Sequence, residues 1–114
     1  MPKGTKCRQI CAEYEHKVFS PQNSENAYIT VSVDELEAMR LCDLEGLNQE
    51  DCAKRMGVSR GTYQRILYSA RHKVVEALTE NQGIIISGGN YVVASEDCGL
   101  AKKCYRCKRQ KKEQ

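Results

Sequence analysis

Residues 51–67 have the sequence DCAKRMGVSRGTYQRIL, which contains the signals for two helices and for the turn that joins them. Gly57 supplies the left-handed residue that commonly ends a helix, and Ser59 is a preferred N-cap for the helix that follows. Two short helices joined by such a turn form a helix-turn-helix, a unit that places its second helix in the DNA major groove. The stretch therefore predicts a helix-turn-helix.

Two further caps, upstream of this stretch, define the other helices. Asn48 predicts a helix over residues 49–56, which forms the first part of the helix-turn-helix. Ser32 and Glu35 have the spacing of a capping box, in which each side chain bonds the backbone of the other, and they predict a helix over about 33–45.

The third helix is expected from Arg60 to about Thr79. Apolar residues recur along it at intervals of three and four, which places them on one face that packs against a core. These residues are Tyr63, Ile66, Leu67, Ala70, Val74, Ala77 and Leu78. The sequence thus predicts three helices, with the third as the longest.

Two short strands are expected outside the helices. AYITVSV alternates and is β-branched, which predicts a strand over residues 28–31, and GIIIS, which begins at Gly83, predicts a second. Two such strands are not stable alone in water, so they should pair with each other or with a second subunit. The expected fold is mainly α, with a helix-turn-helix domain over 28–91 between an irregular, cysteine-containing arm (1–27) and a basic, cysteine-rich tail (92–114).

Charges are sorted along the chain. Residues 34–51 contain seven carboxylates and one base, Arg40, and no acid then occurs between Asp51 and Glu76. The bases in that interval are Lys54, Arg55, Arg60, Arg65, Arg71 and Lys73. The last thirteen residues carry a net charge of +6, although the whole chain has only +3. Basic residues gathered on a helical unit and a tail favour a polyanionic partner such as double-stranded DNA, although a lysine-rich tail also serves solubility.

The face of the third helix opposite its apolar stripe contains the candidates for base recognition. Arginine and glutamine suit bidentate contact with guanine and adenine, whereas the remaining bases should contact phosphates and add affinity without sequence information. The acids of the first helix should then lie away from the DNA. The predicted DNA-binding residues are Ser59, Arg60, Gly61, Thr62, Gln64, Arg65, Tyr68, Lys54, Arg55, Arg71 and Lys73. A helix-turn-helix that contacts a protein, or that is purely structural, is the alternative.

Residues 33–74 resemble the fourth region of sigma factors, the helix-turn-helix that recognises the −35 promoter element. The matching segments are RLCDLEGLNQED, AKRMGVSRGT and SARHKV. With GGNY after the second strand and cysteines near the N-terminus, the whole chain is similar to an uncharacterised family of small prokaryotic proteins presumed to bind DNA, the UPF0251 or DUF134 type. The resemblance implies that Arg60, Gly61 and Arg65 meet bases, and it makes RNA polymerase a candidate partner.

The seven cysteines are many for a cytosolic chain, and an odd number argues against a closed set of disulfides. Two pairs, separated by three and by two residues, have spacings typical of tetrahedral zinc and would join the arm to the tail. The expected metal ligands are Cys7, Cys11, Cys104 and Cys107, with Cys98 in reserve. An iron–sulfur cluster and the absence of a metal are the alternatives. Cys42 and Cys52 lie in predicted helices and are expected to be core residues.

Several classes of protein are disfavoured by what the sequence lacks. No catalytic motif occurs, so we do not expect an enzyme. No apolar run approaches the ~20 residues that cross a bilayer, and the basic N-terminus has no apolar signal segment, so we expect a cytoplasmic protein without membrane contact. The prediction is a homodimeric transcriptional regulator that binds duplex DNA sequence-specifically and holds a metal. The alternative is a metal-handling or redox-sensing protein whose helix-turn-helix contacts another protein.

Overall fold

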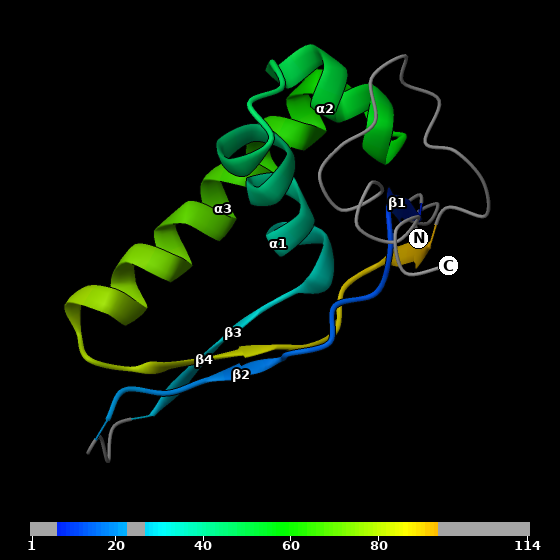
Figure 1. Cartoon of the computed structure of the whole chain (residues 1–114). Helices are drawn as coiled ribbons and strands as arrows, with labels where there is room; N and C mark the ends of the chain where they lie inside the picture. The colour runs from blue at the N-terminus through cyan, green and yellow to red at the C-terminus, as the bar shows by residue number, and fades with distance from the viewer. Residues whose placement is uncertain (1–6, 23–26, 94–114) are drawn as a thin grey trace, which may run out of the picture.

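Three helices and five short strands make up the structure, a computed structural model that describes residues 7–22 and 27–93 (Figure 1). The helices are α1 (Val33–Met39), which continues into a π-helical turn (Arg40–Leu44), α2 (Gln49–Met56) and α3 (Arg60–Thr79). The strands are β1 (Arg8–Ile10), β2 (Val18–Phe19), β3 (Tyr28–Val31), β4 (Gly83–Ile86) and β5 (Tyr91–Val93).

Side-chain caps fix where the helices begin. Ser32, Asn48 and Ser59 each accept a hydrogen bond from a backbone N–H in the first turn of the helix that follows. Ser32 and Glu35 form both hydrogen bonds of the capping box. The predicted starts of all three helices are therefore confirmed, because each depends only on a contact between near neighbours in the sequence.

The first helix differs from its prediction after Met39. The sequence predicts regular helix to residue 45, but the last turn is a π-helix in which the Glu45 N–H bonds the Arg40 carbonyl at 2.9 Å. This wider turn lets the Arg40 side chain reach both Glu37 and Glu45, at 2.9 Å each. The π-helical turn is thus accompanied by ion pairs between side chains, which the periodicity of a helical sequence does not predict.

The strands form two separate sheets. β4 is the central strand of the larger sheet and pairs in parallel with β3 and antiparallel with β2. β1 and β5 form a parallel pair in which Arg8 lies opposite Tyr91 and Ile10 opposite Val93. The two predicted strands are thus confirmed as β3 and β4, and they pair within one chain.

The N-terminal arm is not irregular as the sequence suggests. It contributes β1 and β2, of three and two residues, which are too short for an alternating pattern to be recognised. Ile10 in β1 is 1% exposed and packs in a core cluster with Val31, Val33 and Ile86. Burial of Ile10 and pairing with β5 stabilise this part of the arm.

Two core clusters fix α3 against the rest of the molecule. Leu41, Met56 and Leu67 belong to the cluster between the helices, and the second cluster lies where α1 meets the sheets. In Figure 1 the C-terminal half of α3 lies over the sheet formed by β2, β4 and β3. Leu78, predicted in the apolar stripe, is 74% exposed, because the sheet covers the side of α3 that carries Ala77. Among the described residues, no helix combines the length and the hydrophobicity that crossing a bilayer requires.

Candidate nucleic-acid interface

A tight turn positions α3 relative to α2. Gly57 has a φ of +72° and ends α2, and the Val58 N–H bonds the Ala53 carbonyl at 3.0 Å. Tyr63 is fully buried and its hydroxyl donates to the Ala38 carbonyl at 2.6 Å, which connects α3 to α1. The N-terminal end of α3 is therefore held rigidly while its outer face stays accessible.

Bases near the start of α3 are exposed and lack acidic partners. Lys54, Arg60 and Arg65 are exposed, and no carboxylate in residues 7–22 or 27–93 lies within 4.0 Å of their charged nitrogens. Among the described residues, the Arg65 guanidinium donates only to the Thr62 hydroxyl, at 3.2 Å. Tyr68, one turn further along the same face, is 54% exposed. These side chains form a positive surface at one end of the molecule.

Gly61 lies within this surface, and internal packing does not require a glycine there. A β-carbon added at this position would meet only the Arg65 guanidinium, at 4.0 Å. Packing among the described residues therefore does not account for the glycine at this position.

Other predicted contact residues are engaged inside the protein. Arg55 is 4% exposed, so it is not part of the surface that the sequence predicts for it. Arg71 binds Asp43 at 2.7 Å, and Lys73 binds Glu35 at 3.0 Å. Helix α1 packs against α3, and the π-helical turn that continues α1 places Asp43 beside Arg71, so acids distant in the sequence lie beside these bases.

The remaining predicted residues border the positive surface. The Gln64 amide donates to Gln49 of α2 at 2.8 Å, so this side chain is tied to α2. Ser59 is exposed and caps α3, and its hydroxyl also donates to Thr62 at 3.1 Å. On the two flanks of the first turns of α3, the side chains of Gln64 and Thr62 are therefore each held by a hydrogen bond, to Gln49 and to Ser59.

A groove of about 670 Å³ lies beside the start of α3. Its lining comes from β1, from the beginning of α1 and from α3: Arg8, Ser32, Asp34, Glu35, Val58, Ser59, Thr62, Arg65, Ile66 and Ser69. Arg8 is not among the predicted contact residues, because nothing in the sequence of the arm indicates that it folds back beside α3. The acids at the start of α1 border this groove, which corrects the expectation that they lie away from the basic face.

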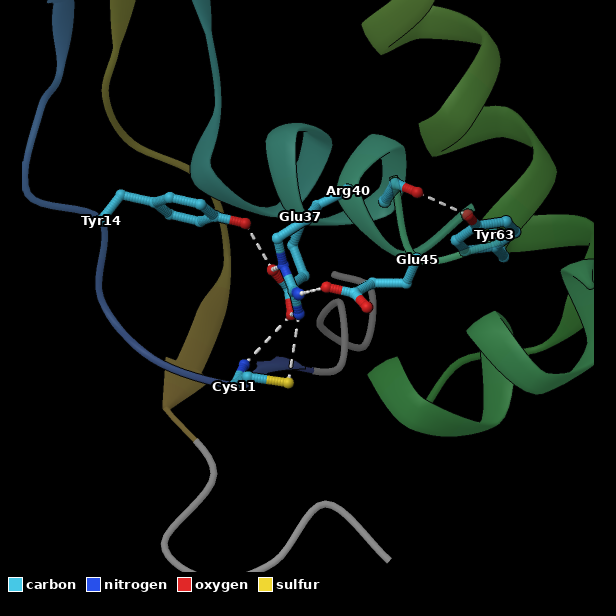
Figure 2. A network of polar contacts seen from close by, with 7 residues as sticks. Cys11, Tyr14, Glu37, Arg40, Glu45 and Tyr63 are labelled. Carbon is cyan, nitrogen blue, oxygen red and sulfur yellow. Dashed lines mark hydrogen bonds and ion pairs between the residues drawn. The ribbon is translucent and has the colours of Figure 1, made fainter. Parts of the chain in front are cut away.

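A buried network joins the N-terminal arm to α1 (Figure 2). The Glu37 carboxylate, whose side chain is 0% exposed, accepts from the Cys11 N–H at 3.1 Å and from the Tyr14 hydroxyl. Arg40 donates to it through two nitrogens at 2.9 Å each, and also to Glu45 and to the Cys11 sulfur. These bonds satisfy a charge that would be very costly to bury alone.

The hydrogen bonds shift the titration of two acids. Burial raises the pKa of Glu35, but bonds from Ser69, the Ser32 backbone and Lys73 outweigh it, so the pKa lies below its ordinary value of 4.5. Burial likewise raises the pKa of Glu37, and its donors outweigh this effect. Both carboxylates are therefore ionised near neutral pH and act as structural anions.

Cys7 and Cys11, the predicted N-terminal ligand pair, are kept apart by β1. The Cys7 thiol donates to the Asn90 side chain at 3.2 Å, and the Cys11 sulfur accepts from Arg40 at 3.2 Å. The structure does not bring the two thiols together.

The other cysteines fall into two groups. Cys98, Cys104 and Cys107 lie outside the described residues, and within those residues there is no group of three or more potential metal ligands. Cys52 is 0% exposed in the core and Cys42 packs against it, as the sequence predicts. Burial raises the pKa of the Cys52 thiol, consistent with a structural role.

The fold and this surface define a small, mainly helical domain with an exposed basic helix end. The family model described as "Protein of unknown function DUF134" matches residues 1–94. The chain is similar to proteins named UPF0251 from Caldicellulosiruptor saccharolyticus (48% identity over 92 residues) and Thermoanaerobacter pseudethanolicus (46% over 100 residues). The chain belongs to this family, which confirms the resemblance of the whole sequence.

The matched regions differ in extent between relatives. The match covers 81% of this chain but 66% of the Caldicellulosiruptor protein, so the chain spans slightly less than two thirds of that relative. For the Thermoanaerobacter protein it covers 85% of both chains. A UPF0251 protein of Clostridium botulinum is 46% identical over 110 residues, which is 94% of this chain and 68% of the relative. No solved structure matches the chain.

Proposed function

We propose that the protein is a transcriptional regulator that binds duplex DNA sequence-specifically, with α2 and α3 acting as a helix-turn-helix. The observation that carries the proposal is the group of exposed bases without acidic partners at the start of α3 and on α2: Lys54, Arg60 and Arg65. Recognition helices contact base edges mainly through their N-terminal turns, which is where these bases lie. The tight glycine turn and the resemblance to sigma region four support the same assignment.

The side chains have distinct roles in this proposal. Arg65 projects from the middle of the exposed face and contacts bases, while Lys54 on α2 contacts the phosphate backbone. Gly61 lets the helix approach the floor of the groove, which accounts for a glycine where packing needs none. The protein acts by binding and is not an enzyme, and RNA polymerase is a candidate partner through the sigma resemblance.

The test is titration of the full chain with labelled duplex DNA over a range of salt concentrations. Because binding releases counterions, the logarithm of the affinity should fall linearly with the logarithm of the salt concentration. A duplex selected from a random library should bind more tightly than a shuffled duplex of equal composition. Lack of affinity for any duplex at low salt would favour the alternative, a helix-turn-helix that contacts protein.

We further propose that the DNA-bound form is a homodimer, because one small recognition unit gives little specificity. Support comes from large apolar side chains left exposed: Val18 (60%), Phe19 (52%), Val75 (56%) and Leu78 (74%). β3 and β4 pair within the chain, so strand exchange is not the basis of this assembly. Sedimentation should give a dimer at micromolar concentration, and the double variant Phe19→Ser and Leu78→Ser should be monomeric.

The cysteine tail supports a second proposal, a zinc site formed by Cys11 with Cys98, Cys104 and Cys107. Because β1 and β5 run in parallel with Ile10 opposite Val93, the end of β5 lies beside the residue that precedes Cys11. This register favours Cys11 over Cys7 as the N-terminal ligand, and an iron–sulfur cluster is the alternative occupant.

Metal analysis of anaerobically purified protein tests this second proposal. Replacement of Cys104 or Cys107 by serine should lower the metal content without unfolding the helices. Replacement of Cys42 should leave it unchanged, because this residue packs against the helical core. A quadruple variant lacking Cys11, Cys98, Cys104 and Cys107 that kept its metal would contradict the assignment.

A further inference from the structure

The groove beside α3 lies on the flank of that helix opposite the one that contacts α2. Gln64 and Arg71 project to one flank, where they bond Gln49 of α2 and Asp43 of the π-helical turn. Thr62 and Ser69 project to the other flank, where they line the groove with Arg8. At 100° per residue these two flanks are nearly half a helical turn apart.

Arg8 is poorly satisfied within the protein. Its Nε is buried and has no hydrogen-bond acceptor in the described structure, and its ion pair with Asp34 is long, at 3.8 Å. Asp34 is better engaged elsewhere, because it accepts from the Ser32 hydroxyl at 2.5 Å. Arg8 lines the groove together with the hydroxyl side chains of Ser59 and Thr62, and a guanidinium in such a setting has the capacity to hold an oxyanion.

Strand pairing holds Arg8 in this position. The Arg8 N–H donates to the Asn90 carbonyl at 2.9 Å, and Arg8 lies opposite Tyr91 in the β1–β5 pair. The neighbouring turn is packed closely, since a β-carbon on Gly89 would lie 2.5 Å from the Asp34 carboxylate. Arg8 is thus fixed relative to α3 although more than fifty residues separate them in sequence.

We propose that the groove is a seat for a backbone phosphate of DNA, held by Arg8 with the hydroxyls of Ser59 and Thr62. The inference rests on the proposed function and adds a DNA contact on the second flank of α3. The major groove is about 12 Å wide, and a helix with its side chains is about 10–12 Å across. A helix in the groove therefore brings the residues on both of its flanks close to the phosphates on the two sides of the groove. Lys54 of α2 contacts the phosphates on one side of the groove, and Arg8 contacts those on the other side.

The test compares Arg8→Ala with the matched control Lys17→Ala, which removes an exposed base from another part of the arm. Arg8→Ala should weaken a selected and a shuffled duplex by the same factor and reduce the slope of log affinity against log salt by about 0.9, the value for one lost phosphate contact. Lys17→Ala should change neither. Unchanged affinity and slope in Arg8→Ala, with Arg65→Ala still impaired, would overturn this inference and leave the proposed function intact.

A further variant separates phosphate binding from a structural role of Arg8. Asp34→Asn removes the ion-pair partner of Arg8 but frees its guanidinium, so DNA affinity should be maintained or increased. If Asp34→Asn instead weakened DNA binding as much as Arg8→Ala does, the ion pair would be the important feature and the proposal would fall.

Saturation of the groove by millimolar inorganic phosphate without displacement of DNA would assign it to a small phosphorylated ligand and overturn the proposal. Absence of duplex binding by the parent chain would overturn this inference and the proposed function together.

Discussion

The two halves of α3 carry similar bases in opposite circumstances. In the C-terminal half, Arg71 is paired with Asp43 of the π-helical turn at 2.7 Å, and Lys73 with Glu35 of α1 at 3.0 Å. In the N-terminal half, Arg60 and Arg65 are exposed and no described acid pairs with them. A run of basic residues therefore has two uses within one helix: one half stabilises the fold, and the other is left for a partner.

The same difference explains the sorting of charge along the sequence. Acids before residue 52 and bases after it are brought together when α1 packs on α3, so part of the sorting is the pattern of an internal interface. Only the bases that packing leaves without acids point to a polyanion. Charge segregation by itself thus overestimates the size of a nucleic-acid surface.

Lowering the pH should have the largest effect on the free energy of unfolding. It protonates both Glu35 and Glu37 and so removes the ion pairs that their carboxylates make. Glu35 and Glu37 have pKa values below the ordinary 4.5, so their contribution to stability is present above that value and is lost as the pH falls through the lower folded-state pKa. The urea midpoint should be nearly constant around neutrality and should fall below about pH 4.5. Glu37→Gln should flatten this dependence, and a midpoint constant down to about pH 3 would contradict it.

Replacement of Glu37 by alanine should have the next largest effect. It removes the main partner of the buried Arg40, and breaking such a pair costs about 3–5 kcal/mol in the free energy of unfolding. Urea denaturation measures the loss, and Glu15→Ala, at an exposed position on the arm, should change stability by less than about 0.5 kcal/mol. Equal effects of the two substitutions would show that the network contributes nothing particular.

Arg65→Ala and Arg71→Ala test the contrast between the two halves of α3 directly. Loss of a bidentate base contact should reduce discrimination between selected and shuffled duplexes by about 1–3 kcal/mol in Arg65→Ala. Arg71→Ala should leave discrimination unchanged, since its guanidinium is held by Asp43. Competition titrations with both duplexes measure the difference, and equal losses in the two variants would show that the two halves of α3 do not differ in DNA recognition.

The smallest effect is expected for the stability of the Arg71–Asp43 pair. Both side chains are more than a third exposed, so a double-mutant cycle should give a coupling of only about 0.2–1 kcal/mol. The coupling should shrink further at high salt, because exposed charges are screened. A coupling above about 2 kcal/mol would mean that this pair behaves as a buried one.

The candidate site could be predicted only in part. The start of α3 and its exposed face follow from Ser59, Gly57 and the spacing of the apolar residues, so Arg60 and Arg65 are correctly expected on the surface. The burial of Arg55 could not be anticipated, because nothing in the sequence around a base on α2 indicates which element covers its side chain. Arg8 was missed for the same reason.

By itself, the sequence determined the features that near neighbours decide. Caps at Ser32, Asn48 and Ser59, and the left-handed turn at Gly57, are contacts within a few residues, and they place all three helices. Only the tertiary structure decided which strands pair, how the arm folds back and which bases find acids. These outcomes depend on side chains that lie far apart in the chain and meet only after the cores form, so no local pattern contains them.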